Sequence, residues 1–303
     1  MTTERAEVGA GVDGVDLAGA TALVTGATSG VGREVALALG RLGARVLVHG
    51  RNEERGAAVV AALRETTTAS FHRAEFASLD DVRGLAAAVR EESESLDVLV
   101  NNAGAHFSEG RLAACGVERT FAVNHLAPFL LTNLLRPALA DGGRVVTVSS
   151  EVHRQGALDL DAVESAAGYD GLDAYARSKL ANVLFTRELA HRLEGAGDDA
   201  ATANCCHPGF VPGSGLWREA SLPVRAAVGA LARLPRPLLE RVADTAVTAA
   251  ETPVYLAAAP DVDGVTGRYF RDREVVEPAA AARDDALAGE LWRASAEWTG
   301  LGG

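Results

Sequence analysis

Short runs rich in apolar and β-branched residues alternate with longer stretches of helical periodicity along most of the chain. Such short, nearly uniform apolar runs are typical of strands buried on both faces of a sheet. Because strands and helices alternate, the pattern predicts right-handed βαβ units and an α/β fold, a parallel sheet with helices on both faces. The expected strands lie at residues 20–25, 45–49, 69–73, 96–100, 144–149, 202–206 and 267–270. The expected helices lie at residues 33–42, 79–90, 116–139 (with a kink at Pro128), 174–193, 244–259 and 284–298.

Two regions depart from this alternation. Residues 1–16 are acidic, rich in glycine and without a period, and we expect a mobile arm there, ahead of one domain at residues 17–301. At residues 211–241, apolar positions are interleaved with arginines and prolines. We favour a substrate lid for this segment, because long irregular segments of compact domains are often functional. A surface connection packed on the core and a helix lying on a membrane surface are the two other interpretations.

Length and composition exclude several classes of protein. The chain has 303 residues, 48% hydrophobic and 23% charged, which is enough for one large α/β domain. Its net charge of −12 argues against nucleic-acid binding and counts against a membrane-surface helix. No apolar run approaches the roughly 20 residues that span a bilayer, and the start of the chain lacks the pattern of a secretory signal. The three cysteines fit neither a zinc site nor a disulfide framework, so we expect free thiols, no metal and a cytoplasmic location.

The strongest local signal for a ligand follows the first expected strand. There the chain reads Gly-Ala-Thr-Ser-Gly-Val-Gly and then enters a helical pattern. Glycines at such a turn let the backbone approach a pyrophosphate, which sits on the helix N-terminus. The spacing differs from the common Gly-x-Gly-x-x-Gly, and a plain tight turn is the alternative. The residues predicted to line this phosphate site are Gly26, Thr28, Ser29, Gly30, Val31 and Gly32.

The end of the second expected strand indicates which dinucleotide is bound. An acidic residue there would bind the ribose 2′-hydroxyl and repel a 2′-phosphate, but the chain has Gly50, Arg51 and Asn52. Arg51 can grip a phosphate with two N–H groups, and Arg33 can assist it. NADP(H) is therefore favoured over NAD(H), the alternative being that both arginines are solvated surface groups.

Small residues and an asparagine follow the fourth expected strand. Asn102, Ala103 and Gly104 form a turn at the strand end that suits the close approach of a flat ring, although an ordinary turn fits as well. Further on, Asn124 lies in an apolar helical stretch, where an asparagine usually satisfies backbone groups.

Three residues carry the candidate chemistry. Tyr175 and Lys179 are four apart in a helical pattern, so their side chains share one face. A cation beside a phenol favours the phenolate, and we expect the pKa of Tyr175 to fall below its usual value of about 10. Ser150 stands where the strand at residues 144–149 ends, and it can hold a carbonyl or hydroxyl oxygen. A Tyr-x-x-x-Lys pair alone is a weak signal, because most instances lie on ordinary exposed helix faces.

Taken together, these motifs resemble the short-chain dehydrogenase/reductase family over most of the chain, and the resemblance implies a single-domain Rossmann-type doubly wound parallel sheet. The stretch Tyr-Ala-Arg-Ser-Lys-Leu-Ala-Asn that starts at Tyr175 is similar to the retinol dehydrogenase branch. Light-dependent protochlorophyllide reductases are a nearby relative. The motifs stand in the family's order: Thr25 to Gly32, Asn101 to Gly104, Asn124, Ser150, Tyr175 with Lys179, and Pro208 with Gly209.

The resemblance implies a catalytic tetrad. Tyr175 is its general acid/base, and Lys179 lowers the pKa of Tyr175 and binds the nicotinamide ribose. Ser150 polarises the substrate oxygen, and Asn124 holds a water for proton relay. Ser149 is implied to be structural. The resemblance also implies cofactor contacts from Glu75, Phe76, Asn102, Ala103, Gly104, Pro208, Gly209 and Val211.

Three features depart from the family's usual pattern. Glu75 replaces an aspartate that often faces the adenine, and it should still accept a hydrogen bond. Gly213 stands where many members place Thr or Ser, and Ser214 is the expected substitute. The interval from Ser150 to Tyr175 is 25 residues, longer than in many members, and the retinol dehydrogenase branch shares such an insert.

The sequence thus predicts an NADP(H)-dependent oxidoreductase that interconverts a carbonyl and an alcohol on a fairly bulky, apolar small molecule. Family analogy implies a homo-oligomer, a dimer or a tetramer. The alternatives are a non-redox tailoring enzyme (an epimerase, dehydratase or cyclase), a carbon–carbon double-bond reductase, and a cofactor-sensing protein without turnover. The mass of the product distinguishes a non-redox tailoring enzyme from an oxidoreductase, because a redox product differs from its substrate by two hydrogens.

Overall fold

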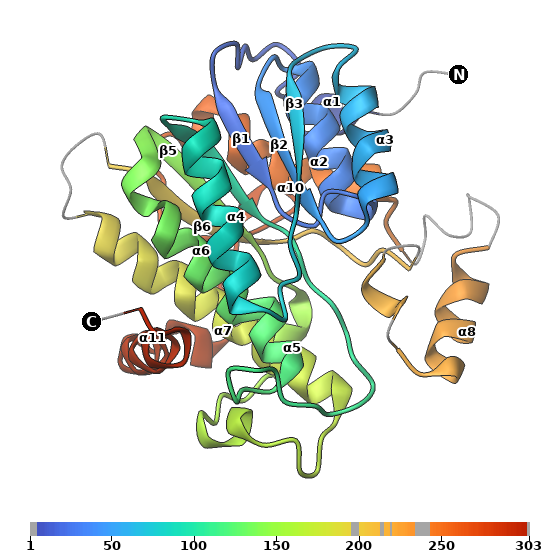
Figure 1. The fold of residues 1–303 in the computed structure, drawn as a ribbon, viewed down its shortest axis with the longest axis vertical. Helices are drawn as coiled ribbons and strands as arrows, with labels where there is room; N and C mark the ends of the chain where they lie inside the picture. Colours follow the sequence, from blue (N-terminus) through green and yellow to red (C-terminus); the bar gives the residue numbers. More distant parts are fainter. Residues whose placement is uncertain (1–4, 195–199, 213–214, 219, 234–242, 302–303) are drawn as a thin grey trace.

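A single sheet organises the computed structural model, which describes residues 5–194, 200–212, 215–218, 220–233 and 243–301. Within these residues eight strands have the order β3-β2-β1-β4-β5-β6-β7-β8 (Figure 1). All neighbours pair in parallel except β7 and β8. This confirms the predicted α/β fold, and the strand order reverses between β1 and β4, where doubly wound sheets bind ligands. The strands are β1 (Thr21–Val24), β2 (Arg45–Gly50), β3 (Ala69–Arg73), β4 (Leu96–Asn101), β5 (Leu139–Val148), β6 (Thr202–His207), β7 (Tyr269–Arg271) and β8 (Glu274–Val275).

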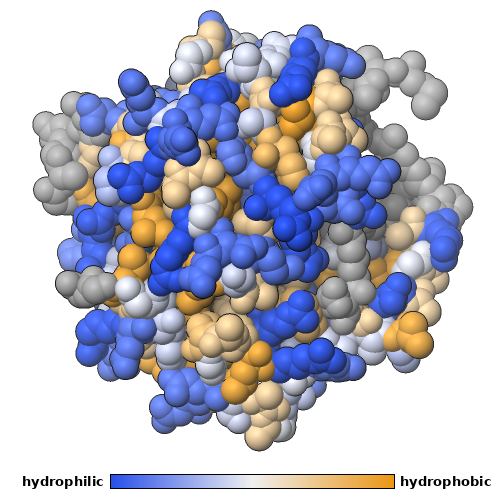
Figure 2. All heavy atoms as spheres, viewed as in Figure 1, coloured by the Kyte–Doolittle hydropathy of each residue, from blue (hydrophilic) through white to orange (hydrophobic). Residues whose placement is uncertain are grey.

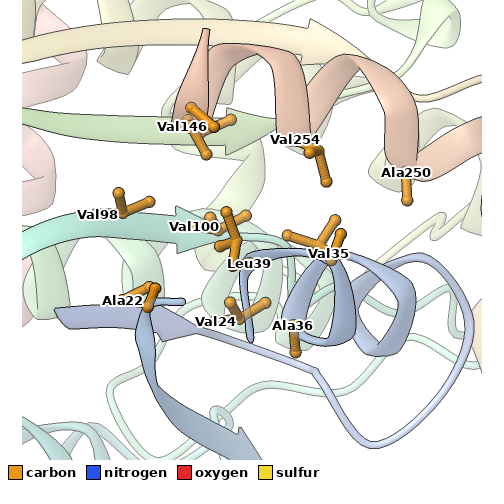
Figure 3. Packing of buried hydrophobic residues seen from close by; sticks show 14 of the residues in the cluster. Ala22, Val24, Val35, Ala36, Leu39, Val98, Val100, Val146, Ala250 and Val254 are labelled. Atoms are coloured by element: carbon orange, nitrogen blue, oxygen red, sulfur yellow. The ribbon is translucent and has the colours of Figure 1, made fainter. Parts of the chain in front are cut away.

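Alternate residues of the buried strands feed two different cores. Val24 and Val100 point to one face, where they meet Val35 of α2 and Val254 of α10 (Figure 3). Leu23, which directly precedes Val24, points the other way and joins the core on the opposite face. The first face is covered by α1 (Ala6–Gly9), α2 (Gly30–Arg41), α3 (Glu53–Leu63) and α10 (Ala246–Ala258), and the second by α4 (Leu79–Glu92), α6 (Ala127–Leu135), α7 (Gly171–Leu193) and α11 (Asp285–Thr299).

The helical region before β5 is broken earlier than the sequence predicts. The stretch expected as one helix consists of α5 (Arg119–Phe121), a π-helical segment (Ala122–Leu126) and then α6. Pro128 is the second residue of α6, directly after the π-helical segment, and the backbone stays helical from one to the other. The irregularity lies in the π-helical segment, which contains Asn124.

Residues 5–16 pack against the body of the protein, which corrects the prediction of a mobile arm. Ala6 and Val12 are at most 2% exposed and join the core formed by α2 and α10. The buried carboxylate of Glu7 accepts hydrogen bonds of 2.5 and 2.7 Å from the Arg41 guanidinium. The acidic, glycine-rich composition conceals the few small apolar residues that dock here, because a single short turn shows no periodicity.

The segment predicted as a lid is only loosely attached where the structure describes it. It contains a short 3-10 helix (Gly215–Arg218) and α8 (Leu222–Leu231), and no residue of α8 is buried. In Figure 1, α8 stands to one side of the sheet, and Figure 2 shows apolar atoms on the surface over it. Leu222 is 77% exposed. The rest of the predicted lid, including residues 234–242, lies outside the described residues. None of the described helices is both long and apolar enough to cross a lipid bilayer.

Candidate active site

A cleft of about 410 Å³ opens at the carboxyl ends of the central strands. It gathers nearly all the residues that the sequence singles out. Three predicted residues, Arg33, Asn52 and Asn124, are not part of its wall. The predicted residues that line it are Gly26, Thr28, Ser29, Gly30, Val31, Gly32, Arg51, Glu75, Phe76, Asn102, Ala103, Gly104, Ser150, Tyr175, Lys179, Pro208, Gly209 and Val211.

The glycine turn between β1 and α2 is pressed against the end of β4. Gly26 has a φ of +65°, and a Cβ on Gly32 would lie 2.3 Å from the Asn102 side-chain nitrogen and 2.7 Å from the Gly26 carbonyl. The Thr25 hydroxyl accepts N–H bonds of 3.0 Å from both Asn102 and Ala103. Only glycine fits this close approach, so the turn has the shape of a cradle for a dinucleotide pyrophosphate.

His49, near the end of β2, supports this cradle and was missed in the sequence. Its Nδ1 accepts the Gly26 N–H at 3.3 Å, so its Nε2–H donates to the Ala74 carbonyl at 3.2 Å. The imidazole ring stacks on the Phe76 ring, with 4.3 Å between the ring centroids. Burial lowers the pKa of His49 to about 4, so the imidazole is neutral at pH 7. The sequence indicates this role only by placing His49 near the end of an expected strand.

The two predicted cofactor-selecting arginines have different surroundings. Arg51 lies at the cleft and pairs with Glu75 at 3.3 Å, both side chains remaining over a third exposed. Arg33 pairs with its neighbour Glu34 away from the cleft wall. Asn52 caps α3, because its side chain accepts the Arg55 N–H at 2.8 Å. Of these groups, Arg51 is therefore the one placed to meet a ligand.

Ser150, Tyr175 and Lys179 come together where β5 ends against α7. The Ser150 hydroxyl lies beside the Tyr175 phenol, near enough to affect its pKa. The Lys179 ammonium lies 5.5 Å from the Tyr175 ring centroid and donates to the Val148 carbonyl at 2.9 Å. His153 Nδ1 contacts the Ser150 carbonyl at 2.8 Å and so helps to fix the serine. The arrangement places two hydroxyls side by side at the cleft, with a basic amine behind them.

Burial reverses the pKa shift that the sequence predicts for Tyr175. Burial raises the pKa of the Tyr175 phenol above its usual value, and the neighbouring Ser150 hydroxyl opposes this only in part. Burial also lowers the pKa of Lys179 to about 8. The expected lowering by Lys179 is corrected: its ammonium is directed at the Val148 carbonyl, and desolvation of the phenol is the larger effect. Tyr175 is therefore protonated at neutral pH.

Asn124 holds the site together from within the π-helical segment. Its Oδ1 accepts the Ala105 N–H at 2.8 Å, and its Nδ2 donates to the Ala105 carbonyl at 2.9 Å and to the Ser178 hydroxyl at 3.0 Å. Ser178 in turn donates to the Tyr175 carbonyl at 2.7 Å. Asn124 thus connects the loop after β4 with the helix that carries Tyr175. Its implied role of holding a water remains a prediction.

A second serine and two buried thiols lie near Lys179. Ser149 donates to the Lys179 carbonyl at 2.7 Å, which agrees with a structural role. Cys205 and Cys206 of β6 lie buried near Lys179, and burial raises the pKa of Cys205 to about 12 and that of Cys206 well above its usual value. Across the described residues, no group of three or more His, Cys, Asp or Glu side chains is arranged to hold a metal ion.

Part of the cleft wall is apolar. Leu172, Phe210, Leu216 and Trp217 line it, and His207 at the end of β6 lines the cleft as well. His207 was not among the predicted site residues, although it directly precedes Pro208. Gly213 and Ser214, expected near the nicotinamide amide, lie outside the described residues.

Comparison with known proteins agrees with this geometry. A family model described as short chain dehydrogenase matches residues 20–222. The chain is 38% identical to retinol dehydrogenase 14 of Mus musculus over 302 residues, covering 93% of this chain and 86% of that relative. It is 40% identical to polyprenol dehydrogenase of Mus musculus over 294 residues, covering 94% and 85%. A solved structure from Escherichia coli CFT073, a short chain dehydrogenase by its title and complexed with NADPH, is 26% identical and covers 85% of this chain and 98% of that one, with a TM-score of 0.64.

Proposed function

This chain belongs to the short-chain dehydrogenase/reductase family, in its retinol dehydrogenase-like branch, and from that premise we propose that it interconverts a carbonyl and an alcohol with NADP(H). It is an oxidoreductase with a site for a nicotinamide cofactor. The observation that carries the finer proposal is that Ser150 and Tyr175 stand next to each other and line the same cleft as the glycine turn. The proposed substrate is a fairly bulky apolar molecule, since the cleft also has several apolar lining residues and the relatives are named for retinol and polyprenol.

In the proposed mechanism, Tyr175 transfers a proton and Ser150 holds the substrate oxygen. When bound, the nicotinamide gives or accepts the hydride. In reduction, Tyr175 donates its phenolic proton to the substrate oxygen, and its raised pKa keeps that proton in place until it is needed. The Ser150 hydroxyl holds the same oxygen and stabilises its developing charge. Lys179, with a pKa of about 8, stands behind the phenol and stabilises the phenolate once the proton has left.

Arg51 supports the choice of NADP(H). Its ion pair with Glu75 is exposed, and pairs of this kind contribute little, so the guanidinium is free to turn to a phosphate. A guanidinium grips a phosphate with two parallel N–H bonds. The related structure from Escherichia coli that contains NADPH agrees with this choice.

Tyr175→Phe tests the chemistry. General acid catalysis contributes roughly 10²–10⁴-fold, so we expect kcat with NADPH and an aryl ketone to fall by about that factor. The dissociation constant of NADPH, measured by energy transfer from the tryptophans, should stay the same. Tyr255→Phe, the same change in α10, is the control and should leave kcat intact. Equal turnover by Tyr175→Phe and the wild type would exclude Tyr175 as the acid, and a product of unchanged mass would exclude redox chemistry.

Arg51→Asp tests the cofactor. A carboxylate at this position repels a 2′-phosphate, so we expect NADPH to bind at least about tenfold more weakly while NADH binds as well or better. Arg55→Asp makes the same charge change at an exposed position of α3 and serves as the control. A preserved preference for NADPH in Arg51→Asp would place the determinant elsewhere.

The proposal also includes a reducing cytoplasmic setting and a homo-oligomer. All three cysteines are free thiols in the structure, which supports the setting. Light scattering on the purified protein measures the oligomer directly, and a monomer at micromolar concentration would contradict that part.

A further inference from the structure

Two aromatic side chains beside Tyr175 carry buried nitrogens without a hydrogen-bond partner among the described residues. They are both ring nitrogens of His106, which is 4% exposed, and the indole nitrogen of Trp217. A buried polar group left unpaired costs about 1–3 kcal/mol, and native proteins pair nearly all of them. Three such atoms in one place therefore indicate that something outside the chain binds there.

The His106 ring lies near both the catalytic tyrosine and Trp217 of the lid segment. His106 is in the loop after β4, two residues beyond Gly104, and its ring centroid is 6.2 Å from that of Tyr175 and 5.4 Å from that of Trp217. The His106 backbone N–H donates to the Leu216 carbonyl at 3.2 Å. Trp217 lines the cleft and His106 lies behind it, so a turn of the indole about its side-chain bonds would bring the imidazole to the cleft.

The pair is suited to an uncharged oxygen. Burial lowers the pKa of His106, although the Asp170 carboxylate opposes this, so the ring is neutral at pH 7. A neutral imidazole offers one N–H donor and one acceptor, and the indole offers one N–H donor. A hydroxyl or carbonyl oxygen can accept from both rings, whereas the neighbouring Asp170 disfavours an anion.

We propose that His106 and Trp217 form a specificity subsite that hydrogen-bonds a second, uncharged oxygen of the substrate. This inference rests on the proposed function, since the first oxygen is the one handled by Ser150 and Tyr175. Because the three rings are close together, the two oxygens are separated by only a few bonds. The substrate class is therefore an α- or β-oxygenated ketone, a hydroxy ketone or a diketone on a bulky apolar frame.

The test compares benzoin with deoxybenzoin, two ketones of nearly equal size that differ by one hydroxyl. The measured quantity is the ratio of kcat/KM for benzoin to that for deoxybenzoin, with NADPH. The two ketones differ in intrinsic reactivity, but this difference is the same for every variant, so a change in the ratio isolates the subsite. His106→Phe and Trp217→Phe keep a ring and remove the polar nitrogens, and His106→Gln retains a donor and an acceptor.

We expect the ratio to fall about tenfold in His106→Phe and in Trp217→Phe, the loss expected for one hydrogen bond to an uncharged group. His106→Gln should recover part of it, and NADPH affinity should change little in all three variants. An unchanged ratio in both phenylalanine variants, or a parallel loss for both ketones, would overturn the subsite. Turnover of neither ketone by the wild type would overturn the proposed function instead. Calorimetry would then still decide the subsite, because equal wild-type affinities for the two ketones would contradict it.

Discussion

The glycine turn and the lid segment both line one cleft and are built in opposite ways. The turn is held by hydrogen bonds that involve Thr25, His49 and Asn102, residues in or directly after the central strands. The lid segment, where it is described, ends in α8, a helix without a single buried residue. Under the proposed function, the cofactor meets the firmly held turn and the substrate meets the more loosely attached segment.

The same substitution in both regions gives the largest expected contrast. Gly32→Ala places a Cβ 2.3 Å from the Asn102 side chain, and Gly229→Ala places one 3.8 Å from its nearest neighbour, an arginine side chain. We expect Gly32→Ala to weaken NADPH binding about a hundredfold and to destabilise the fold by about 1–3 kcal/mol. Gly229→Ala, in the exposed α8, should stabilise its helix by about 0.5–1 kcal/mol. Titration with NADPH and thermal melting measure both, and equal effects would remove the contrast.

The N-terminal segment, like the glycine turn, is firmly held by the body of the protein. Deleting residues 1–16 removes the buried Ala6 and Val12 and leaves Arg41 without its carboxylate partner. We expect a loss of roughly 2–4 kcal/mol of unfolding free energy from these two causes. Urea denaturation measures it, with a deletion of residues 1–4 as the control. An unchanged midpoint would restore the mobile arm.

The pH dependence of stability also sharpens the comparison, because His49 is buried under the glycine turn. Its pKa is about 4 in the folded protein, against an ordinary value of 6.5. As pH falls from about 6.5 to about 4, the unfolded chain binds a proton at this position and the folded protein does not, so stability is lost with falling pH. The shift corresponds to about 3 kcal/mol. His125, lowered to about 3, adds to the loss.

His49→Asn should flatten this slope, whatever it does to stability at pH 7. The exposed His191→Asn, on the far end of α7, should leave the slope unchanged. Denaturation curves at several pH values between 4 and 7 give the slope directly. Equal slopes in the wild type and His49→Asn would show that the imidazole is not buried in solution.

The smallest effect is expected on α8. Leu222 is 77% exposed, so Leu222→Ala should change the unfolding free energy by less than about 0.5 kcal/mol. A larger loss, measured in the same urea titration, would mean that α8 packs against a surface of its own or a neighbouring molecule in solution.

Patterns that act over short distances were readable in the sequence. The strands of the sheet, the glycine turn and the four-residue spacing of Tyr175 and Lys179 each follow from local geometry. The roles of His49 and His106 do not, because His49 meets Gly26 from 23 residues away and His106 meets Trp217 of the lid segment from the distant loop after β4. The pKa of Tyr175 was predicted in the wrong direction for the same reason: desolvation depends on everything packed around a group, which no spacing reveals.

The burial of the two β6 thiols affects how the protein is handled and how it resists oxidation. Only a thiolate reacts readily with peroxide or an alkylating reagent. Cys205 and Cys206 are closed off from solvent, and their raised pKa values keep them as thiols at physiological pH. The partly exposed Cys115 is therefore the thiol expected to label first with iodoacetamide. Oxidation of either β6 cysteine would require the sheet to open first, so these cysteines report unfolding rather than redox state.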